Sequence, residues 1–187
     1  MTVHSFEILT SWFNLMDKDG WIGREQILGD EARSKVPKEF QVQYPHYANP
    51  PTLFLTLEAL LDKMELSADK GPYMDFLRNI YPKLKLHYQW YRKTQFGEVK
   101  SYDRDAFSTK EAYRWRGRTP QHILPSGLDD YPRAQPPHPG ELHVDLLSWM
   151  GLMSRSLSRI ASTLSESSDA KKFSAAEDAI ILSLIHI

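Results

Sequence analysis

The stretch PPTLFLTLEALLDKMEL, residues 50–66, decides the fold class because its apolar side chains recur at helical spacing. Side chains three and four positions apart line one face of a helix, and Pro51 suits the first helical turn. A helix with one apolar stripe must bury it against another element, so the stretch predicts a packed helix. The stripe consists of Leu53, Leu57, Leu60, Leu61 and Met64.

Segments on both sides of this stretch show the same helical spacing. Pro82 lies inside the third expected helix and should kink it, because proline removes a hydrogen-bond donor there. The alternation of apolar and polar residues that is typical of strands is nowhere sustained. We therefore expect an all-α fold of about five helices. The other expected helices cover residues 4–17, 71–96, 140–166 and 170–184.

Two long stretches between the expected helices, residues 21–51 and 97–140, lack any sustained period and are rich in polar, aromatic and proline residues. Loops of this length in a compact domain are usually functional or disordered, and their aromatic residues argue against disorder. Helices joined alternately by short turns and by long loops resemble a toroid of helical hairpins. We expect the two long loops to line a pocket.

The composition is that of a globular chain with balanced charge. Its 187 residues are 41% hydrophobic and 12% aromatic, enough for one domain with a core or for part of a larger one. The 23 basic and 24 acidic residues disfavour nucleic acid and anionic membranes as partners. The N-terminus lacks the pattern of a signal peptide, and no apolar run reaches the roughly 18 residues of a membrane span. We expect no direct membrane contact by this segment.

Two motifs suggest a metal by composition, but their spacing is wrong. An EF-hand loop with Gly20 at its conserved glycine would place Leu15 and Gln26 where acidic ligands are needed. His138 and His143 are not four residues apart on a helix, as a zinc-binding histidine pair would be. We therefore expect no metal and no cofactor, and we interpret the Asp-Gly motif at Gly20 as a turn.

Arginine and aromatic residues alternate in YRWRGR, residues 113–118. Such a stretch can stack on a nucleic acid base or a sugar ring. A net charge of −1 favours the sugar, and the alternative is a solvated basic turn that Tyr113 and Trp115 pack onto the core. Other loop aromatics that could form a binding wall are Trp21, Tyr44, Tyr47 and Tyr131.

Two adjacent carboxylates, Asp129 and Asp130, lie in a Gly- and Pro-rich turn before the fourth expected helix. A proton donor needs a carboxylate held rigidly where desolvation raises its pKa. Gly127 permits close approach of a ligand, and Arg133 could keep one carboxylate ionised while the other stays protonated. Acidic turns also form for structural reasons, because Asp accepts local backbone hydrogen bonds. The residues alone leave both interpretations open.

Two long segments carry a family resemblance. WIGREQILGDEARSKVPKEFQVQYPHYANPPTLFL, residues 21–55, and YRWRGRTPQHILPSGLDDYPRAQPPHPGELHVDLLSWM, residues 113–150, strongly resemble the catalytic domain of the mannosyl-oligosaccharide glucosidase family, the processing α-glucosidases I. The resemblance implies an (α/α)6 toroid of helical hairpins, of which residues 1–180 would form about half. Residues 181–187 resemble a sequencing-adapter junction, and we expect this tail to be truncated or non-native.

The resemblance also implies a reaction, the inverting removal of the terminal α-1,2-linked glucose from the triglucosylated N-glycan precursor. Asp129, directly after SGL, matches the family's general acid, and the general base is a Glu downstream of this chain. The chain alone should therefore be nearly inactive. The residues that match the glucose pocket and its rim are Trp21, Arg24, Glu25, Trp115, Arg116, Gly127, Asp130 and Arg133.

The implied partner is an N-linked oligosaccharide, and the implied location is the endoplasmic reticulum lumen, on a membrane-anchored full-length protein. Two alternatives remain. One is a trehalase-like or bacterial-type α-glycosidase on the same toroid. The other is a non-catalytic helical carbohydrate-binding module, suggested by the missing base and by the loop aromatics.

Overall fold

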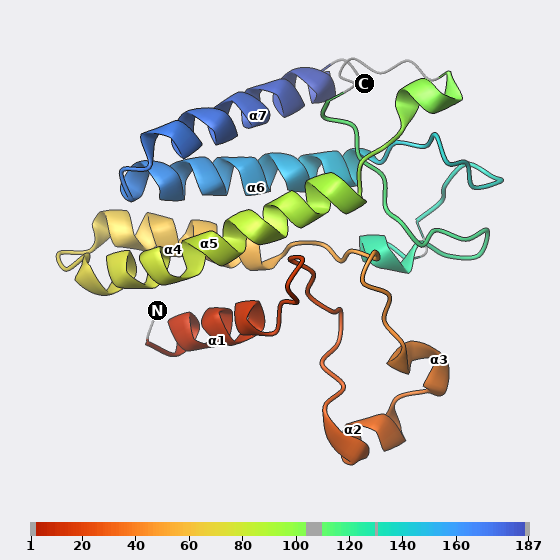
Figure 1. The fold of residues 1–187 in the computed structure, drawn as a ribbon, viewed down its shortest axis with the longest axis horizontal. Coiled ribbons are helices and arrows are strands. Elements are labelled where there is room, and N and C mark those ends of the chain that lie inside the picture. The colour runs from red at the N-terminus through yellow and green to blue at the C-terminus, as the bar shows by residue number, and fades with distance from the viewer. Residues whose placement is uncertain (1–2, 104–109, 130, 186–187) are drawn as a thin grey trace.

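The computed structural model describes residues 3–103, 110–129 and 131–185, and these are helical apart from connecting loops and an isolated bridge between Phe96 and Tyr113 (Figure 1). The expected all-α class is confirmed. The α-helices are α1 (Val3–Asn14), α2 (Gly29–Lys35), α3 (Lys38–Gln41), α4 (Leu53–Leu66), α5 (Gly71–Thr94), α6 (Val144–Thr163) and α7 (Ser167–Ile185), and the 3-10 turns are η1 (Val99–Tyr102) and η2 (Leu124–Ser126).

The five long helices pack in layers, with α6 between α7 on one side and α4 and α5 on the other, and with α1 against α5 (Figure 1). The short connections α4–α5 and α6–α7 lie at one end of this stack. The two long connections, residues 15–52 and 95–143, gather at the opposite end. The predicted alternation of short turns and long loops is therefore observed, and the first loop contains the short helices α2 and α3.

The predicted apolar stripe of α4 is buried except at its first position. Leu57, Leu60, Leu61 and Met64 lie in the core, whereas Phe54 replaces the half-buried Leu53 as its first member. Helix α5 runs through Pro82 without ending, because this proline lies on the exposed face. The helix is thus amphipathic along its whole length, as its sequence spacing predicts.

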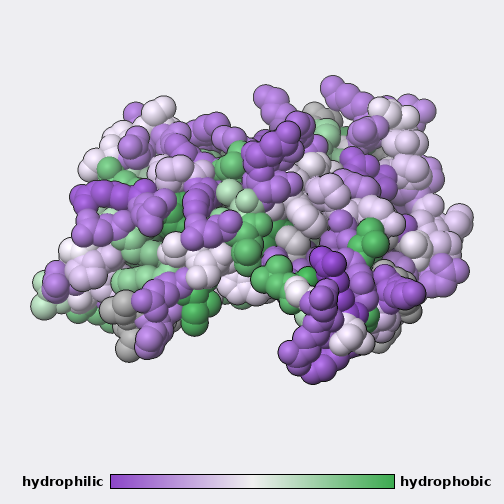
Figure 2. Space-filling model, turned by 60° about the horizontal axis from the view of Figure 1, so that its bottom comes forward, coloured by the Kyte–Doolittle hydropathy of each residue, from purple (hydrophilic) through white to green (hydrophobic). Residues whose placement is uncertain are grey.

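Apolar side chains also reach the surface of the long helices. Figure 2 shows apolar patches among hydrophilic side chains on one face of the molecule. Large exposed apolar residues on the helices include Ile8 of α1, Leu55 of α4 and Leu182 of α7. The long helices of this chain therefore carry apolar side chains on their surface as well as in the core.

Arg159 of α6 joins that helix to α4 through three carboxylates. Its guanidinium contacts Glu58, and it lies 2.8 Å from both the Asp62 and the Glu65 carboxylates. Ser156, one turn earlier on α6, donates its hydroxyl to the same Glu58. One cation therefore compensates three anions that share a face of α4.

The variant Arg159→Met should destabilise the fold while keeping most of the apolar stem. We expect the free energy of unfolding to fall by about 1–3 kcal/mol, because the part-buried Glu58 loses its cation and the three carboxylates repel one another. Urea unfolding measures the change. The matched control is Arg78→Met, since Arg78 and Asp75 form an ion pair on the surface. This variant should lower the free energy of unfolding by less than about 0.5 kcal/mol. Equal losses in the two variants would contradict this account.

Candidate functional site

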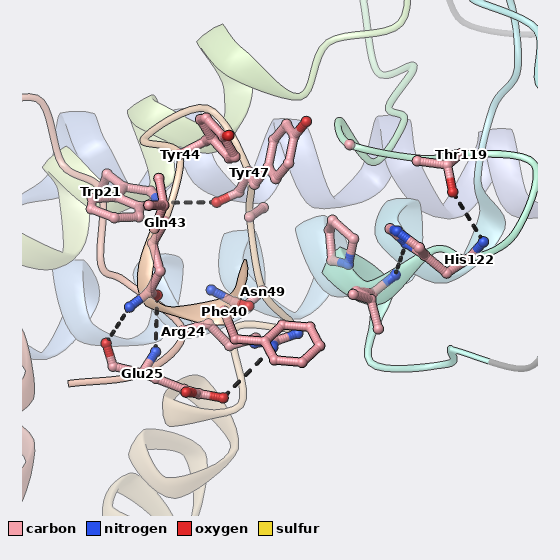
Figure 3. A pocket seen from close by; sticks show the side chains of 15 residues that line it. Trp21, Arg24, Glu25, Phe40, Gln43, Tyr44, Tyr47, Asn49, Thr119 and His122 are labelled. Carbon is pink, nitrogen blue, oxygen red and sulfur yellow. Dashed lines mark hydrogen bonds and ion pairs between the residues drawn. The ribbon is translucent and has the colours of Figure 1, made fainter. Parts of the chain in front are cut away.

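A pocket of about 680 Å³ opens between the first long loop and residues 117–125 of the second (Figure 3). Aromatic rings from the first loop form one side, and Thr119 and His122 lie opposite them. The pocket therefore lies at the loop-bearing end of the helices, where the sequence predicts it. The aromatic residues that line it are Trp21, Phe40, Tyr44 and Tyr47.

Trp21 is fixed at both its backbone and its ring. The Asp17 carboxylate accepts hydrogen bonds from the backbone N–H groups of Asp19 (2.9 Å) and Trp21 (2.8 Å), which forms the predicted turn after α1. The Trp21 indole donates to the Tyr47 carbonyl at 2.9 Å. Gly20 has a φ of +102°, and a Cβ there would lie 2.6 Å from the Leu86 carbonyl oxygen of α5. The turn thus requires glycine for close contact with α5.

Gln43 clamps the part of the loop that carries the pocket's charged residues. Its amide accepts from the Glu25 N–H at 3.0 Å and donates to the Glu25 carbonyl at 2.6 Å. The Arg24 guanidinium lies 3.6 Å from the Glu25 carboxylate, and both side chains are partly exposed to the pocket. Asn49 adds a further amide to this wall. The pocket therefore presents amides, one cation and one anion beside aromatic faces.

The second wall approaches the first through Gly117. This residue has a φ of +86°, and a Cβ would lie 2.8 Å from the Tyr47 ring. Beyond it, the Thr119 hydroxyl accepts from the N–H groups of Gln121 and His122, which holds residues 119–122 in a tight turn. Glycine is required at residue 117 because the backbone of one wall touches the ring of the other.

This arrangement suits a neutral, hydroxyl-rich ligand. Aromatic rings can stack on the apolar face of a sugar, while the amide, guanidinium and carboxylate groups can bind its hydroxyls. The described residues contain no group of three or more His, Cys, Asp or Glu side chains that could hold a metal ion. The side chains that do line the pocket offer aromatic faces for stacking and polar groups for hydrogen bonding.

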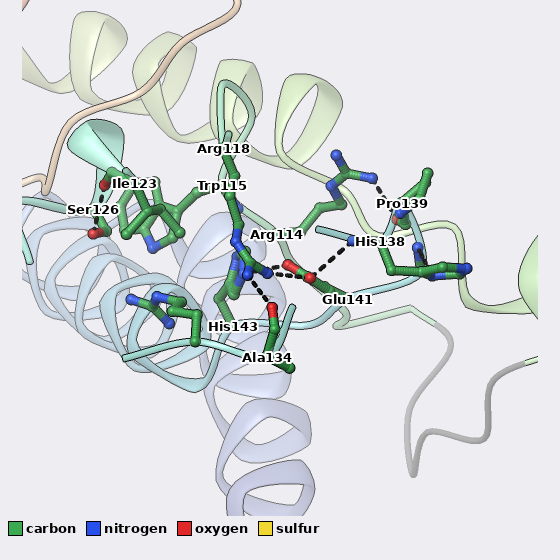
Figure 4. Close-up of polar contacts among 12 residues, drawn as sticks. Arg114, Trp115, Arg118, Ile123, Ser126, Ala134, His138, Pro139, Glu141 and His143 are labelled. Atoms are coloured by element: carbon green, nitrogen blue, oxygen red, sulfur yellow. Dashed lines mark hydrogen bonds and ion pairs between the residues drawn. The ribbon is translucent and has the colours of Figure 1, made fainter. Parts of the chain in front are cut away.

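A buried polar cluster lies behind the second wall (Figure 4). Arg118 pairs with Glu141, and His143 contacts the other Glu141 oxygen at 3.3 Å. The Trp115 N–H donates to His143 Nδ1 at 2.9 Å, so the ring proton lies on Nε2, facing Glu141. Burial would raise the pKa of Glu141, but the His138 N–H and Arg118 outweigh it and hold this pKa below its ordinary value.

Two residues predicted to contact glucose, Trp115 and Arg116, bind groups of the supporting structure. Trp115 is fully buried, and its indole donates to Asp145 of α6 at 2.9 Å. Arg116 directs its guanidinium to the carbonyls of Thr94 (2.9 Å) and Phe96 (3.0 Å), at the C-terminus of α5. Neither lines the pocket, because each side chain satisfies polar groups of the scaffold. Direct contact of either residue with glucose stays a prediction.

The turn with the predicted general acid lies after η2. Gly127 ends η2 with a φ of +68°, and Asp129, two residues on, is exposed. Asp130 lies outside the described residues. Arg133 pairs with Asp145 at 3.3 Å and lies over the Tyr131 ring, and its effect on the ionisation of Asp129 or Asp130 stays a prediction.

Of the residues predicted for the site, the structure brings Trp21, Arg24 and Glu25 together in the pocket. Gly127 and Asp129 are exposed in the following turn and do not line it. The sequence analysis missed four polar residues that line the pocket. Thr119 could have been found from the turn signal Thr-Pro, whereas Gln43 depends on pairing with a residue 18 positions away. The missed residues are Gln43, Asn49, Thr119 and His122.

Comparison with known proteins decides the family. Residues 2–186 match the glycosyl hydrolase family 63 C-terminal domain. The chain belongs to glycosyl hydrolase family 63. This family assignment covers both segments that form the pocket, and it confirms the resemblance seen in the sequence.

Similar proteins in three organisms support this assignment. The chain is 49% identical to a probable mannosyl-oligosaccharide glucosidase of Schizosaccharomyces pombe and 42% identical to the mannosyl-oligosaccharide glucosidase of Saccharomyces cerevisiae. These matches cover 96% and 97% of the chain and 26% of each yeast protein. It is also 39% identical to alpha-glucosidase 2 of Arabidopsis thaliana, over 83% of the chain and 20% of that protein. The family 63 chain thus spans about a quarter of the length of its yeast relatives.

Alanine at two glycines should separate backbone strain from contact between the walls. Gly29 and Gly117 both have positive φ, +81° and +86°, but a Cβ at Gly29 would meet no atom within 4 Å. We expect Gly29→Ala to cost about 1 kcal/mol of unfolding free energy through strain. Gly117→Ala should cost about 1 kcal/mol more and displace the Tyr47 ring. Unfolding curves and the NMR shifts of Tyr47 test this, and an unmoved ring would refute the contact.

Two buried histidines should make stability depend on pH. Burial lowers the pKa of His87 and of His143 to about 4, with the charge of Arg133 adding to the effect at His143. Their unfolded pKa is about 6.5, so the unfolded state binds more protons as pH falls from about 6.5 to 4. The stability that neutral histidine provides is present above pH 6.5 and is lost through this window. Each histidine contributes up to about 1.4 kcal/mol per pH unit.

The test compares urea unfolding across this pH range in the wild type and in His143→Asn. The variant should show a slope smaller by about 1.4 kcal/mol per pH unit at most, because one proton uptake is removed. Gln89→Asn, a neutral exchange on the exposed face of α5, is the control and should keep the wild-type slope. A slope in His143→Asn equal to that of the wild type would exclude this residue as a source.

Proposed function

We propose that this chain is part of an inverting α-glucosidase that removes the terminal α-1,2-linked glucose from the triglucosylated N-glycan precursor. The observation that carries the proposal is the aromatic and polar pocket, whose two walls come from the two segments with family resemblance. The two yeast relatives carry the name mannosyl-oligosaccharide glucosidase, in one case as probable, which supports this choice of substrate. In this proposal Trp21, Arg24 and Glu25 bind sugar, and Trp115 and Arg116 position the second wall.

Asp129 is the proposed general acid. It follows the left-handed Gly127, where a Cβ would lie 3.0 Å from Pro50, next to the pocket residue Asn49. The Ser126 hydroxyl accepts from the Leu128 N–H at 3.1 Å and donates to the Ile123 carbonyl, which fixes the turn just before the acid. A turn held in this way can present a carboxyl group to the glycosidic oxygen, as proton donation requires. We assign Gly127 and Arg133 to shaping the same turn, and we propose that Asp130 helps to shape the glucose pocket.

Inversion requires a second carboxylate that activates water on the opposite face of the sugar, about 6.5–9.5 Å from the acid. Glu25 lines the pocket but pairs with Arg24, which suits it to binding hydroxyls. We therefore place the general base in the portion of the relatives that this chain does not cover. Without it, the rate should fall by on the order of 10² to 10⁴.

The proposed location follows from the proposed substrate. An N-glycan precursor is processed in the secretory pathway, and we place this activity in the endoplasmic reticulum lumen, on a membrane-anchored protein. The described helices include none long and apolar enough to cross a membrane. The chain has 23 basic and 24 acidic residues, so it has no excess of positive charge. Electrostatics therefore disfavours nucleic acid as a partner.

A carbohydrate-binding role without turnover is the second candidate. It is favoured by one observation, that the carboxylate lining the pocket, Glu25, is engaged in an ion pair with Arg24. A module of this kind would bind glucosides in the pocket and release no glucose. Turnover therefore separates the two candidates.

Replacing Asp129 with Asn tests the enzyme directly. The chain is placed in the corresponding segment of the S. pombe relative, and glucose release from a triglucosylated glycan is measured. The parent chimera should release β-glucose first, which NMR of the anomeric proton can detect. Asp129→Asn should lower the rate by on the order of 10² or more, because proton donation is lost.

Asp178→Asn, an exposed carboxylate on α7, is the matched control and should keep the rate of the parent chimera. Full activity in Asp129→Asn would remove this residue as the acid. Initial release of α-glucose would exclude inversion. Binding of glucoside without any turnover in the parent chimera would favour the non-catalytic module.

A further inference from the structure

Side chains of the C-terminal half of α5 hold the first pocket loop by binding the backbone of that loop. Side chains at spacings of three and four residues, from His87 on this helix to its C-cap Gln95, hydrogen-bond to carbonyls of that loop. His87 contacts the Gly20 carbonyl at 2.7 Å, and Gln95 donates to the His46 carbonyl at 2.8 Å. Trp90 and Tyr91, between them, donate to the carbonyls of Pro45 and Asn49.

Gln95 also holds the second wall. It is fully buried, and while its Nε2 donates to the His46 carbonyl of the first loop, its Oε1 accepts from the Arg116 N–H at 3.0 Å. Its own carbonyl accepts from the Arg114 N–H at 2.9 Å. The orientation of the amide is determined, because its nitrogen faces a carbonyl and the Thr94 hydroxyl while its oxygen faces an N–H. A single side chain therefore joins both loops that form the pocket.

We propose that Gln95 is a positioning residue that sets the separation of the two pocket walls, and that glucoside binding depends on it although it does not line the pocket. The dependence of sugar binding rests on the proposed function, whereas the coupling of the walls does not. Trp21 donates to the Tyr47 carbonyl, next to His46, and Gly117 follows Arg116 and meets the Tyr47 ring. Movement at either end of the Gln95 amide would therefore reach the aromatic wall.

The amide is required because it donates on one side and accepts on the other. In Gln95→Glu, measured at a pH at which this side chain is ionised, the carboxylate can still accept from the Arg116 N–H, but it cannot donate to the His46 carbonyl and repels it. In Gln95→Met a side chain of similar length does neither. Gln95→Glu thus releases the first wall alone, and Gln95→Met releases both walls. Gln89→Glu and Gln89→Met, on the exposed face of the same helix, are the matched controls.

Hydrogen exchange measured by NMR on the 187-residue chain tests the coupling. The reporters are the Trp21 indole N–H for the first wall, the Arg116 N–H for the second, and the Leu157 N–H of the buried α6 as reference. In Gln95→Met we expect exchange to accelerate by about tenfold at both walls relative to Leu157, the factor that corresponds to one lost hydrogen bond. In Gln95→Glu only the Trp21 indole should accelerate.

Three results would overturn the coupling. In Gln95→Met, the first is equal acceleration of exchange at all three reporters, and the second is unchanged exchange at both walls. In Gln95→Glu, the third is a change of exchange at Arg116 without a change at Trp21. Should Gln95→Met fail to fold, the contrast between Trp21 and Arg116 in Gln95→Glu still decides the matter. The Gln89 variants should match the wild type at all three sites.

Titration with glucosyl-α-1,2-glucose, followed through the Trp21 indole signal, tests the effect on binding. Both Gln95 variants should bind this disaccharide about tenfold more weakly at a temperature where their spectra are those of folded protein. A merely structural role would lower stability and leave the Kd of the folded molecules unchanged, which would overturn the dependence of binding on Gln95. Absence of any shift in the wild type would instead reject the proposed function, and the exchange result would still decide the coupling.

Discussion

The pocket depends on hydrogen bonds from one face of α5 to backbone carbonyls of loops that have little secondary structure of their own. A buried carbonyl without a partner costs free energy, so an irregular loop can pack against a helix only where the helix supplies donors. Helix α5 supplies indole and phenol donors along its C-terminal half, and its C-cap supplies an amide donor. Because these donors are regularly spaced, the loop carbonyls that they bind are held at regular intervals along α5, although the loop itself is irregular. The position of the aromatic wall therefore follows from the register of α5.

The second loop satisfies its polar groups in a different way. Arg116 binds the carbonyls at the C-terminus of α5, where the helix leaves carbonyls unpaired, and its charge suits the negative end of the helix dipole. Trp115 and His143 connect the same loop to the start of α6. Residues of one short motif thus face away from the pocket while Gly117, directly after them, faces it. The motif contributes to the site mainly by fixing where its backbone passes.

The sequence predicts the helices well because their signal is local and repeated. The stripe of α4 and the alternation of short and long connections are both visible in the spacing of apolar residues. Helices α2 and α3 were not predicted, because each is short and α2 buries no residue, so neither has an apolar period. Of the aromatic residues considered for a binding wall, Trp21, Tyr44 and Tyr47 line the pocket and Trp115 and Tyr131 do not, and sugar binding by the wall stays a prediction.

The contacts of several residues near the site could not be predicted from the sequence, for one physical reason. Whether Trp115 faces a ligand or the core depends on the distant Asp145 that accepts its N–H, and no local pattern encodes that partner. The same holds for Gln43 and Gln95, whose amides act only through backbone groups brought near by the fold. An amide side chain carries no charge and has no strong periodic signature, so its role appears only when both of its partners are located. In this chain the residues that build the pocket are therefore harder to recognise from sequence than those that line it.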